Sequence, residues 1–425
     1  MQIGDDITNL QGMYHPRLQT DRLRLLARSF PVVIVGGARQ VGKTTLLRHC
    51  FPDIDYVVFD PSLDIENARA EPDLFLRNHP PPAILDEIQY APELAGAIKR
   101  HVDRQPDLCG QHLLTGSQQW QMLRELTESL AGRAAFLDLH GFSLLEITDT
   151  QGAWLPRWLE RRNDFLAEAR AGARYPGALT EWLWRGTLPR ARVIESAAIP
   201  DFWLGYHRTY VERDLRLQGE VEDWQQFGRF IGLMSALTAQ EINYSQLGRE
   251  IGLAGQSARR WLAMMTATYQ WTEIPAYSGN ATKRVSGRPK GYIADTGLAC
   301  HHARLSTPKA LPSHPLFGAL FETAMAAEML KQAATLPARP ACFHWRSAGG
   351  AEVDLILEHD DWLYPFAFKL TAAPTRRMAS GINAFRRAYP RATIATGALL
   401  CAVEEPRWIA ENVMALPWNL LRVGD

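Results

Sequence analysis

The stretch between residues 37 and 44 combines glycines, a lysine and a threonine at the spacing of a phosphate-binding loop. It reads GARQVGKT, a full GxxxxGK[ST] pattern, and lies between the apolar run VVIVG and an amphipathic segment. Backbone N–H groups of such a loop surround phosphate oxygens, and the following helix adds positive potential. Lys43 would reach the β- and γ-phosphates of ATP, and Thr44 would bind Mg²⁺. The expected nucleotide contacts are Gly37, Ala38, Arg39, Gln40, Val41, Gly42, Lys43, Thr44 and Thr45.

Acidic and hydroxyl side chains end two later apolar runs, where they could act on a bound phosphate. Asp86 and Glu87 end PAILDE, and Ser117 ends HLLTGS. We expect Asp86 to hold Mg²⁺ and Glu87 to polarise the attacking water. A helix N-terminal cap is the alternative for this pair. We expect Ser117 to sense the γ-phosphate, with a hydroxyl-stabilised turn as the alternative.

A second set of chemically active residues lies toward the other end of the chain. Glu322 lies in FETAMAAEML, Asp354 in AEVDLILE and Lys369 at the end of YPFAFK, an order that resembles the PD-(D/E)xK nuclease fold. Two or three carboxylates with a lysine can hold Mg²⁺ against a scissile phosphate. Where an acid is usual, two residues before the lysine, the chain has Ala367. We therefore expect a nuclease-like scaffold without cleavage, and compensation by Glu322 is the alternative.

Short apolar runs alternate with helical segments through the first third of the chain. The runs are PVVIVGG, DYVVFD, PAILDEI, QHLLTGS and AAFLDLH. This alternation predicts an α/β fold in which a parallel sheet is covered by helices. The pattern next becomes helical, then shows short helices with a hairpin, and returns to a smaller α/β pattern. The expected domains are 1–150 (ATPase core), 151–215 (helical lid), 216–304 (winged helix-turn-helix) and 305–425 (inactive nuclease-like domain).

The stretch NYSQLGREIGLAGQSARRWLAMMTATYQWTEIPAY has the rhythm of a winged helix-turn-helix. Its second helix would direct Arg259 and Arg260 outward, and two strands would follow around a basic tip. In such folds a recognition helix enters the major groove of DNA and the wing contacts phosphate. Binding to another protein, or packing against the ATPase core, is the alternative. The expected DNA contacts are Arg259, Arg260, Lys283, Arg284, Arg288 and Lys290.

Bulk composition limits the classes of function. The 425 residues have a net charge of zero, so any DNA contact depends on local basic patches. The opening residues lack the basic start and apolar core of a secretory signal, and no apolar run reaches the ~18–20 residues of a membrane helix. The five cysteines form no CxxC pair. We expect a cytoplasmic protein with reduced thiols and no membrane partner, and metal binding or disulfides are the alternative for the cysteines.

The segments GGARQVGKTTLL, AILDEIQ, LLTGSQQ and ESLAGRAAFLDL follow one another in an order that resembles AAA-type ATPases of archaea and bacteria. The resemblance implies an arginine finger or sensor at Arg133, acting in cis or from a neighbouring subunit, with a surface salt bridge as the alternative. It also implies a homo-oligomer such as a ring. In WLWRGTLPRARV it implies a lid motif around Gly186 and Pro189, where Thr187 replaces a usual second glycine. YIADTGLA and HWRSAGGAEVDLILE extend the resemblance into the second half.

These features favour an ATP-hydrolysing AAA-type motor that binds or remodels DNA. Duplex or branched DNA, such as a Holliday junction, would be its partner, and ATP with Mg²⁺ its cofactors. The first alternative is a nucleotide-dependent signalling switch with slow ATP turnover. The second is an ATP-regulated nuclease, an activity that Ala367 disfavours.

Overall fold

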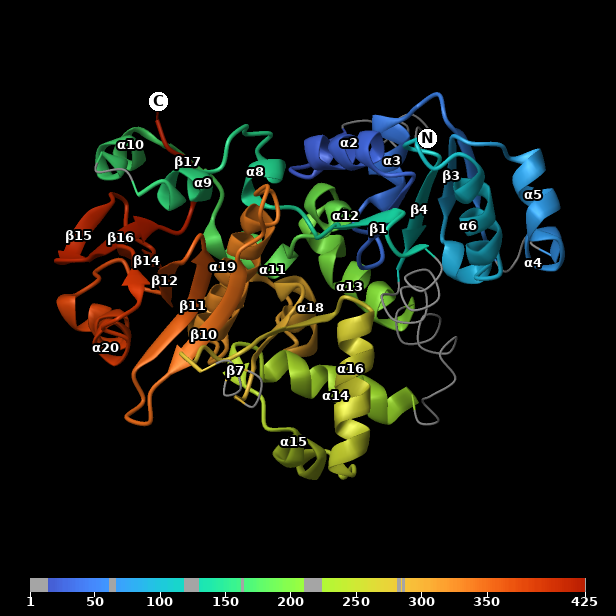
Figure 1. The fold of residues 1–425 in the computed structure, drawn as a ribbon. Coiled ribbons are helices and arrows are strands. Elements are labelled where there is room, and N and C mark those ends of the chain that lie inside the picture. The colour runs from blue at the N-terminus through green and yellow to red at the C-terminus, as the bar shows by residue number, and fades with distance from the viewer. Residues whose placement is uncertain are drawn as a thin grey trace, which may run out of the picture.

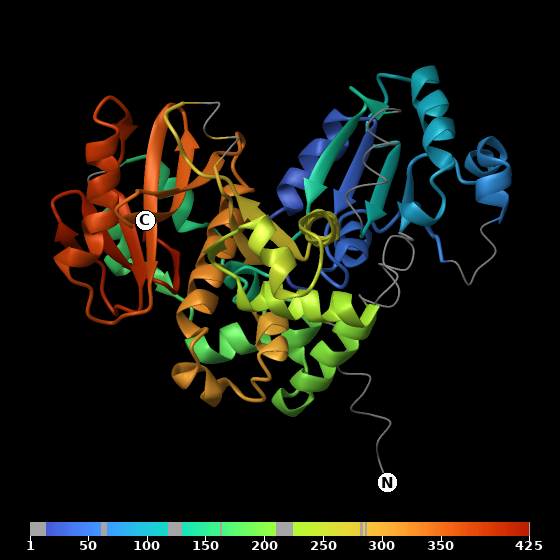
Figure 2. The ribbon, with the colours of Figure 1, turned by 90° about the horizontal axis from the view of Figure 1, so that it is seen from below.

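The computed structural model of the chain describes residues 14–60, 66–117, 130–161, 164–209, 224–280, 284 and 287–424. A parallel sheet with its helices lies at one end, a mixed sheet lies at the other, and a mainly helical region lies between them (Figure 1 and Figure 2). In the described part of the chain, no helix has both the length and the apolar character needed to cross a membrane.

The first domain contains a five-stranded parallel sheet in the order β2-β3-β4-β1-β5. Its strands are β1 (Val32–Gly36), β2 (Asp55–Val58), β3 (Ala83–Asp86), β4 (His112–Gly116) and β5 (Ala134–Asp138). Its helices are α2 (Thr20–Ser29), α3 (Lys43–Cys50), α4 (Glu66–Ala70), α5 (Pro72–Asn78), η1 (Ile88–Tyr90) and α6 (Leu94–Arg104). Each predicted apolar run forms one strand, so the expected parallel sheet is confirmed. The loops that follow the parallel strands therefore meet at one edge of the sheet.

The two faces of this sheet bury alternate residues of the same strand. Val33 and Val35 of β1 belong to one apolar cluster, which also includes Leu46 of α3. Ile34 belongs to a different cluster, together with Ile98 of α6. Successive side chains of a strand point to opposite faces, so helices cover the sheet on both sides. Burying each such aliphatic side chain stabilises the fold by about 1.5–3 kcal/mol.

The helical region that follows has two parts with different neighbours. Its elements are α8 (Leu144–Ile147), α9 (Trp154–Leu159), α10 (Phe165–Ala171), β6 (Ala173–Arg174), α11 (Leu179–Arg185), α12 (Pro189–Val193), η2 (Ser196–Ala198) and α13 (Ile199–Thr209). The rings of Trp154 and Trp158 each lie 6.4 Å from the ring of Phe366, in the C-terminal sheet. Pro189, in contrast, lies beside the phosphate-binding loop. The expected lid at 151–215 therefore does not pack as one unit in its described residues, because its first part contacts the C-terminal sheet and its second part contacts the loop.

The chain between 224 and 302 folds as helix, strand, helix, helix, two strands and a helix. The elements are α14 (Trp224–Ala236), β7 (Gln240–Glu241), α15 (Tyr244–Glu250), α16 (Gly255–Ala267), β8 (Trp271–Ile274), β9 (Lys290–Ile293) and α18 (Thr296–His302). β9 pairs antiparallel with both β7 and β8. On α16, Trp261 and Met265 are buried, whereas Arg259 and Arg260 are exposed.

The C-terminal domain places a mixed sheet between two helices. Its elements are η5 (Pro308–Ser313), α19 (Phe317–Ala333), β10 (Ala341–Arg346), β11 (Glu352–His359), β12 (Trp362–Lys369), η6 (Arg376–Ala379), α20 (Ser380–Ala388), β13 (Thr393–Ile394), β14 (Gly397–Cys401), β15 (Arg407–Ala410), β16 (Val413–Pro417) and β17 (Leu420–Arg422). The sheet has the order β10-β11-β12-β14-β16-β15, with β13 beside β12. Leu355 and Phe366 share an apolar cluster with α19, whereas Ile356 and Ala367 share one with α20.

The last strand returns to the helical region. β17 pairs antiparallel with β6, through Leu420 with Arg174 and Arg422 with Ala173. Tyr364 of β12 also donates a hydrogen bond of 2.9 Å to the carbonyl oxygen of Leu159. Residues 154–174 are therefore attached to the C-terminal domain by strand pairing, ring contacts and hydrogen bonds.

Candidate functional site

The phosphate-binding loop joins β1 to α3 at the carboxyl edge of the parallel sheet. Gly37 has a φ of 151° and Gly42 one of 94°, both in the range that favours glycine. A Cβ on Gly37 would lie 2.3 Å from the carbonyl oxygen of Leu139, so a larger residue would force the backbone apart. α3 begins at Lys43, directly after the loop. Loop N–H groups and a helix N-terminus therefore meet at one place.

Lys43 is buried against the loop that precedes it. Its Nζ donates to the carbonyl oxygens of Gly37 and Ala38, at 3.0 Å and 3.1 Å. Both of these acceptors are neutral. A negatively charged phosphate oxygen is a stronger acceptor for an ammonium group than a carbonyl oxygen. Turning to a phosphate would therefore exchange these two hydrogen bonds for stronger, charge-assisted ones.

Asp86 ends β3, and three hydroxyl groups surround its buried carboxylate. Thr44 Oγ1 donates to Oδ2 at 2.7 Å, Tyr56 donates to the same oxygen at 2.6 Å, and Thr115 donates to Oδ1. Burial and the neighbouring Asp86 carboxylate raise the pKa of Tyr56, so its phenol stays a donor. The two expected Mg²⁺ ligands, Thr44 and Asp86, thus touch. The motifs did not indicate Tyr56, whose only signal is its place on the strand next to β3.

Glu87 lies beside the loop in an uncommon backbone conformation. Its φ of 57° is left-handed, which is uncommon for a residue other than glycine. Its N–H donates to Thr115 Oγ1 at 3.0 Å. Gln89 Nε2 donates both to a Glu87 carboxylate oxygen and to Ser117 Oγ, the latter at 3.2 Å. Glu87 and Ser117, from the ends of different strands, are therefore brought together through Gln89.

A pocket of about 530 Å³ lies over the loop. It is lined by Tyr14, His15, Arg17, Gln40, Gly42, Lys43, Thr44, Thr45, Glu87, Phe142, Pro189, Arg190 and Val193. Ala38 and Val41, also expected contacts, line a second cavity of about 400 Å³, and Arg39 Nη2 lies 3.5 Å from the hydroxyl of Tyr90. The sequence motifs did not indicate Arg17, whereas Arg190 directly follows the lid proline. The exposed Arg190 brings positive charge to this pocket, whereas Arg17 is buried and paired with Glu146.

Arg133 lies at the opposite edge of the sheet. It immediately precedes β5, and its carbonyl oxygen accepts from Val32 N at the start of β1, at 3.2 Å. Its guanidinium pairs with Asp103 at 2.5 Å. A strand of five residues is roughly 16 Å long, so Arg133 cannot reach a phosphate on its own loop. This position favours action from a neighbouring subunit over action in cis, and the role of Arg133 stays a prediction.

Buried polar contacts connect the loop to α19. Arg17 Nη1 donates to the carbonyl oxygen of Val41 in the loop at 2.7 Å, and its Nε pairs with Glu146 at 2.9 Å. Glu146 caps α8 together with Ser143. The N–H of Leu144, two residues before Glu146, donates to Glu328 of α19 at 3.2 Å. Buried polar contacts therefore run without interruption from the loop to a helix of the C-terminal domain.

The lid motif belongs to the same network. Lys331 of α19 donates to the carbonyl oxygen of Phe142 at 2.8 Å, and Phe142 N donates to the carbonyl oxygen of Thr187 at 2.7 Å. Thr187 donates to Asp295 through its N–H at 2.8 Å and its hydroxyl at 2.7 Å. Burial raises the pKa of Asp295 and lowers that of Lys331. The threonine at the position of the missing glycine therefore joins the lid to the start of α18.

The expected DNA contacts divide into exposed and buried groups. Arg259 and Arg288 are exposed and line a groove of about 1020 Å³. The guanidinium of Arg259 lies 4.7 Å from the ring centre of Tyr244. Arg260 is exposed on the same helix. Lys283 lies outside the described residues.

Two expected DNA contacts of the wing are wrong. Arg284 donates to Glu358 of β11 at 2.9 Å and lies over the ring of Tyr277, with 4.5 Å to its centre. Lys290 is only 2% exposed and forms ion pairs with the C-terminal domain. The physical reason is that the expected wing, the segment from β8 to β9 (residues 271–293), packs along β10 where it is described: Tyr277 N donates to the carbonyl oxygen of His344 at 2.6 Å. Charge alone could not reveal which surface the wing faces.

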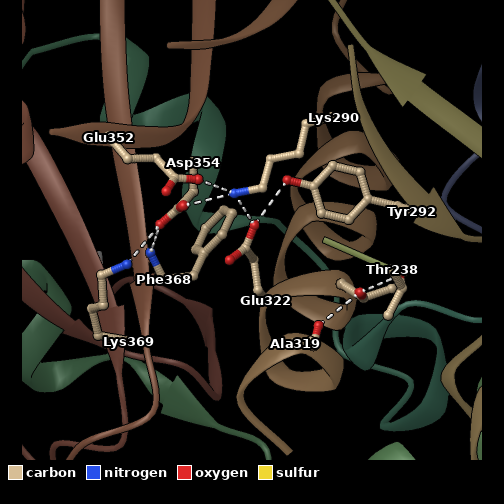
Figure 3. Close-up of polar contacts among 10 residues, drawn as sticks. Thr238, Lys290, Tyr292, Ala319, Glu322, Glu352, Asp354, Phe368 and Lys369 are labelled. Atoms are coloured by element: carbon tan, nitrogen blue, oxygen red, sulfur yellow. Dashed lines mark hydrogen bonds and ion pairs between the residues drawn. The ribbon is translucent and has the colours of Figure 1, made fainter. Parts of the chain in front are cut away.

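The expected nuclease-like residues do meet, but around a lysine from another part of the chain (Figure 3). Lys290 Nζ of β9 pairs with Glu322 at 2.5 Å, with Asp354 at 3.0 Å and with Glu352. Lys369 Nζ donates to the other oxygen of Asp354 at 3.3 Å. We call Glu322, Glu352 and Asp354 with Lys290 the carboxylate cluster. Glu352 was missed, although it lies two residues before Asp354 on β11 and strand alternation places both on one face.

Ala367 occupies an apolar environment. It is 3% exposed and belongs to the apolar cluster that includes Ile382 and Phe385 of α20. A carboxylate at this position would adjoin an apolar cluster, which is costly without a partner. The absence of the usual acid therefore matches the packing around it.

Comparison with known proteins assigns the first domain. Residues 29–148 match the family described as AAA domain, and residues 177–309 and 317–421 match two families described as Domain of unknown function (DUF8612) and Domain of unknown function (DUF4143). The single match over 177–309 joins the lid helices α11–α13 with the segment predicted as a separate winged domain. Uncharacterized protein Rv2008c of Mycobacterium tuberculosis is 29% identical over 365 residues, which cover 85% of this chain and 76% of that protein. Uncharacterized protein Mb2031c of Mycobacterium bovis gives the same values.

Solved structures resemble the chain only distantly. The RuvB Holliday junction branch migration motor of Thermotoga maritima has a TM-score of 0.28 and 14% identity, covering 67% of this chain and 96% of that chain. A signal transduction ATPase with a tetratricopeptide repeat sensor from Pyrococcus horikoshii has a TM-score of 0.23 and 12% identity, covering 74% and 49%. Neither likeness is close enough to indicate a function. Residues 29–148 form an AAA-type P-loop ATPase domain, and two domains of unknown function follow it in the chain.

Proposed function

We propose that the chain hydrolyses ATP with Mg²⁺ and uses the reaction to change the arrangement of its later domains. The observation that carries the proposal is the hydrogen-bonded series Thr44–Asp86–Thr115–Glu87 beside Lys43. These groups fit a Mg²⁺–nucleotide, because a hydroxyl and a carboxylate already in contact are the usual ligands of this metal in P-loop proteins. Mg²⁺ would neutralise charge on the β- and γ-phosphates. Glu87 would orient and deprotonate water, and Lys43 and Arg190 would bind phosphate oxygens.

An ATPase assay of Glu87→Gln tests this role. The amide cannot accept the proton of water, so turnover should fall at least about 100-fold while ATP binding is retained. Glu71→Gln, at an exposed position on the same domain, is the matched control and should keep full turnover. Equal turnover of the two variants would contradict the assignment of Glu87.

The proposed output is conformational, and the buried network from the loop to α19 supports it. Asp295 accepts both bonds from Thr187, so Asp295→Asn leaves the lid and α18 less firmly joined. We expect ATP to alter hydrogen exchange of α19 in the wild type and to alter it less in this variant. ATP turnover should stay within about threefold, because Asp295 does not line the nucleotide pocket. An unchanged exchange response would favour an ATPase whose output goes elsewhere.

A second candidate function is DNA binding through α16. The order of elements from α14 to β9 is typical of a winged helix, and the exposed Arg259 and Arg260 with the groove near Arg288 favour it. Each arginine that neutralises a phosphate adds about 0.9 to the slope of log affinity against log salt. Replacing Arg259 and Arg260 by alanine should therefore lower the slope by about 2. Replacing the exposed Arg24 and Arg28 of α2 should leave it unchanged, and equal slopes would remove DNA from consideration.

A homo-oligomer, such as a ring, would give Arg133 a role in trans. Its position at the edge opposite the loop is compatible with contact to the ATP of a neighbouring subunit. Mixing Arg133→Ala with Glu87→Gln chains tests this, because only a mixed oligomer would contain a complete site. Turnover in the mixture above that of either variant alone is expected, and no recovery would assign Arg133 to its surface pair with Asp103.

A further inference from the structure

Tyr269 reaches from the middle of the chain to the carboxyl edge of the parallel sheet. It lies between α16 and β8, in residues 268–270, which we call the α16–β8 corner. Its hydroxyl donates to Oδ1 of Asp138, the last residue of β5, at 2.9 Å. Its φ of 59° is left-handed, a conformation that is uncommon for a bulky side chain. The contact therefore joins the α16–β8 corner to the edge of the sheet where the phosphate-binding loop starts.

The same phenol lies against Gly36, the residue directly before the loop. A Cβ added to Gly36 would clash with the hydroxyl oxygen of Tyr269 and would lie 3.1 Å from the ring carbon that carries it. The φ of Gly36 is not positive, unlike that of Gly37, so its backbone conformation does not require a glycine. The absence of a side chain at Gly36 instead leaves space for the phenol.

The partner of the phenol belongs to a segment that supports the first residues of the loop. Leu139 N donates to the carbonyl oxygen of Gly36 at 2.8 Å. A Cβ on Gly37 would clash with the carbonyl oxygen of Leu139. Since Asp138 and Leu139 are consecutive, the hydrogen bond from Tyr269 holds the segment on which Gly36 and Gly37 rest.

Open space beside the loop increases the importance of these contacts. The cavity of about 400 Å³ described above is lined by Ala38 and Val41 of the loop and by Tyr269. The loop therefore has no packed wall where it faces this cavity. Without the phenol, the start of the loop would gain conformational freedom, and a bound nucleotide would have to remove that freedom at a cost in affinity.

We propose that Tyr269 is a positioning residue for the nucleotide site: its phenol preorganises the start of the loop, so nucleotide affinity depends on docking of the α16–β8 corner. Tyr269 does not line the nucleotide pocket, so it acts through Gly36 and Asp138. Coupling between two sites is reciprocal, so a bound nucleotide also tightens this docking. The inference rests on the nucleotide binding of the proposed function, and it does not rest on hydrolysis.

Equilibrium binding of mant-ADP, a fluorescent nucleotide, to the full chain with Mg²⁺ tests the proposal. Tyr269→Phe removes the hydroxyl and keeps the ring. It should raise Kd about three- to tenfold, a part of the usual contribution of a hydrogen bond to a charged group. Tyr364→Phe is the matched control, because its hydroxyl also joins two parts of the chain, at the carbonyl oxygen of Leu159, and Tyr364 does not line the pocket. Its Kd should stay within about twofold of the wild-type value.

Gly36→Ala tests the contact itself. Its methyl group would displace the hydroxyl of Tyr269, so this variant should also bind mant-ADP at least about threefold more weakly. In the double variant with Tyr269→Phe, the methyl group meets no hydroxyl. The double variant should therefore bind no more weakly than Gly36→Ala alone, whereas losses that simply add would mean that the two residues act independently.

Hydrogen exchange measures the reciprocal effect. ADP with Mg²⁺ should slow exchange in peptides that span the α16–β8 corner at least about twofold in the wild type and in Tyr364→Phe, but not in Tyr269→Phe. A residue with only a structural role would not change this response to nucleotide. Urea unfolding of the two phenylalanine variants shows whether a loss of affinity reflects incomplete folding.

A folded Tyr269→Phe chain with the wild-type Kd would overturn the proposal. Slowing of exchange by ADP that persists in this variant would also overturn it. A wild-type chain that binds mant-ADP but releases no phosphate from ATP would contradict only the proposed hydrolysis. A wild-type chain that binds no mant-ADP would overturn both.

Discussion

The phosphate-binding loop and the carboxylate cluster both place a buried lysine near acidic residues, but they hold it differently. Lys43 donates to backbone carbonyls of its own loop, and the nearby Asp86 takes its hydrogen bonds from hydroxyl groups. Lys290 instead contacts carboxylates directly, and they lie on elements of another domain. Lys43 can exchange its hydrogen bonds to those neutral carbonyl oxygens for bonds to a ligand. Lys290, in contrast, is itself the counter-charge of the buried carboxylates. Similar residue types thus serve a ligand site in one domain and a joint between domains in another.

The largest expected effect is on the stability of the carboxylate cluster. Lys290→Met should lower the free energy of unfolding by about 3–5 kcal/mol, because it leaves buried carboxylates uncompensated. Lys369→Met should cost less than about 1 kcal/mol, since Lys369 is 42% exposed. Urea unfolding in metal-free buffer measures both. Equal losses would mean that Lys290 contributes no more than an exposed ion pair.

The next effect concerns turnover at the loop. Lys43→Met should lower the rate of ATP hydrolysis by about 100- to 1000-fold, the usual cost of removing a donor that stabilises transition-state charge. Lys290→Met should change turnover much less, because Lys290 does not line the nucleotide pocket. Steady-state phosphate release measures both. A comparable loss in the two variants would break the contrast and make Lys290 part of the ATPase site.

Acid should destabilise the chain through His112 of β4, which belongs to neither of the two lysine sites. Burial lowers the pKa of His112 to about 4, and neither ring nitrogen has a hydrogen-bond partner among the described residues. The unfolded state binds a proton below pH ~6.5, so stability is full above this pH and falls until about pH 4. Between pH 6.5 and 5 the loss is about 2 kcal/mol. His112→Leu should remove this loss, whereas His49→Gln, at an exposed position, should not. The urea midpoint of each variant, measured against pH, tests this. The same pH dependence in both variants would contradict the role of His112.

The smallest effect should come from the groups that position Asp86. Thr115→Val keeps the shape of the side chain but removes the bonds to Asp86 and to Glu87 N. Loss of such a positioning group costs about tenfold in activity, or ~1.4 kcal/mol. The change should appear in kcat and in the Mg²⁺ concentration for half-maximal rate. Thr209→Val, in a helix away from the pocket, is the control, and no difference between the two would leave Thr115 without a positioning role.

The loop and its sheet could be predicted because their signals are local. The glycines, Lys43 and Thr44 lie within one short stretch, and β1 and α3 flank it directly. The apolar runs of the first domain are continuous because both faces of a parallel sheet are buried. Local pattern was therefore sufficient to identify the strands and the side chains at their ends.

The joint between domains could not be predicted in the same way. Lys290 is 62 and 64 residues before Glu352 and Asp354, and Arg284 is 74 residues before Glu358. A basic hairpin has the same sequence pattern whether it faces solvent, DNA or another domain. Glu352 could have been predicted from the sequence, because its spacing from Asp354 places both on one face of a strand. Arg17 could not have been predicted, since its partner Glu146 lies 129 residues away in the sequence.

The pairing of β17 with β6 has a consequence for dividing the chain into fragments. A fragment starting at residue 305 would lack the partner of its last strand and leave Phe366 without Trp154 and Trp158. Such a fragment should aggregate through an unpaired strand edge and uncovered aromatic rings. A permuted chain that joins the C-terminus to residues 151–176 should instead be soluble. The C-terminal domain is thus completed by residues from an earlier part of the chain. During synthesis, these residues leave the ribosome before the β8–β9 segment that packs on the same domain.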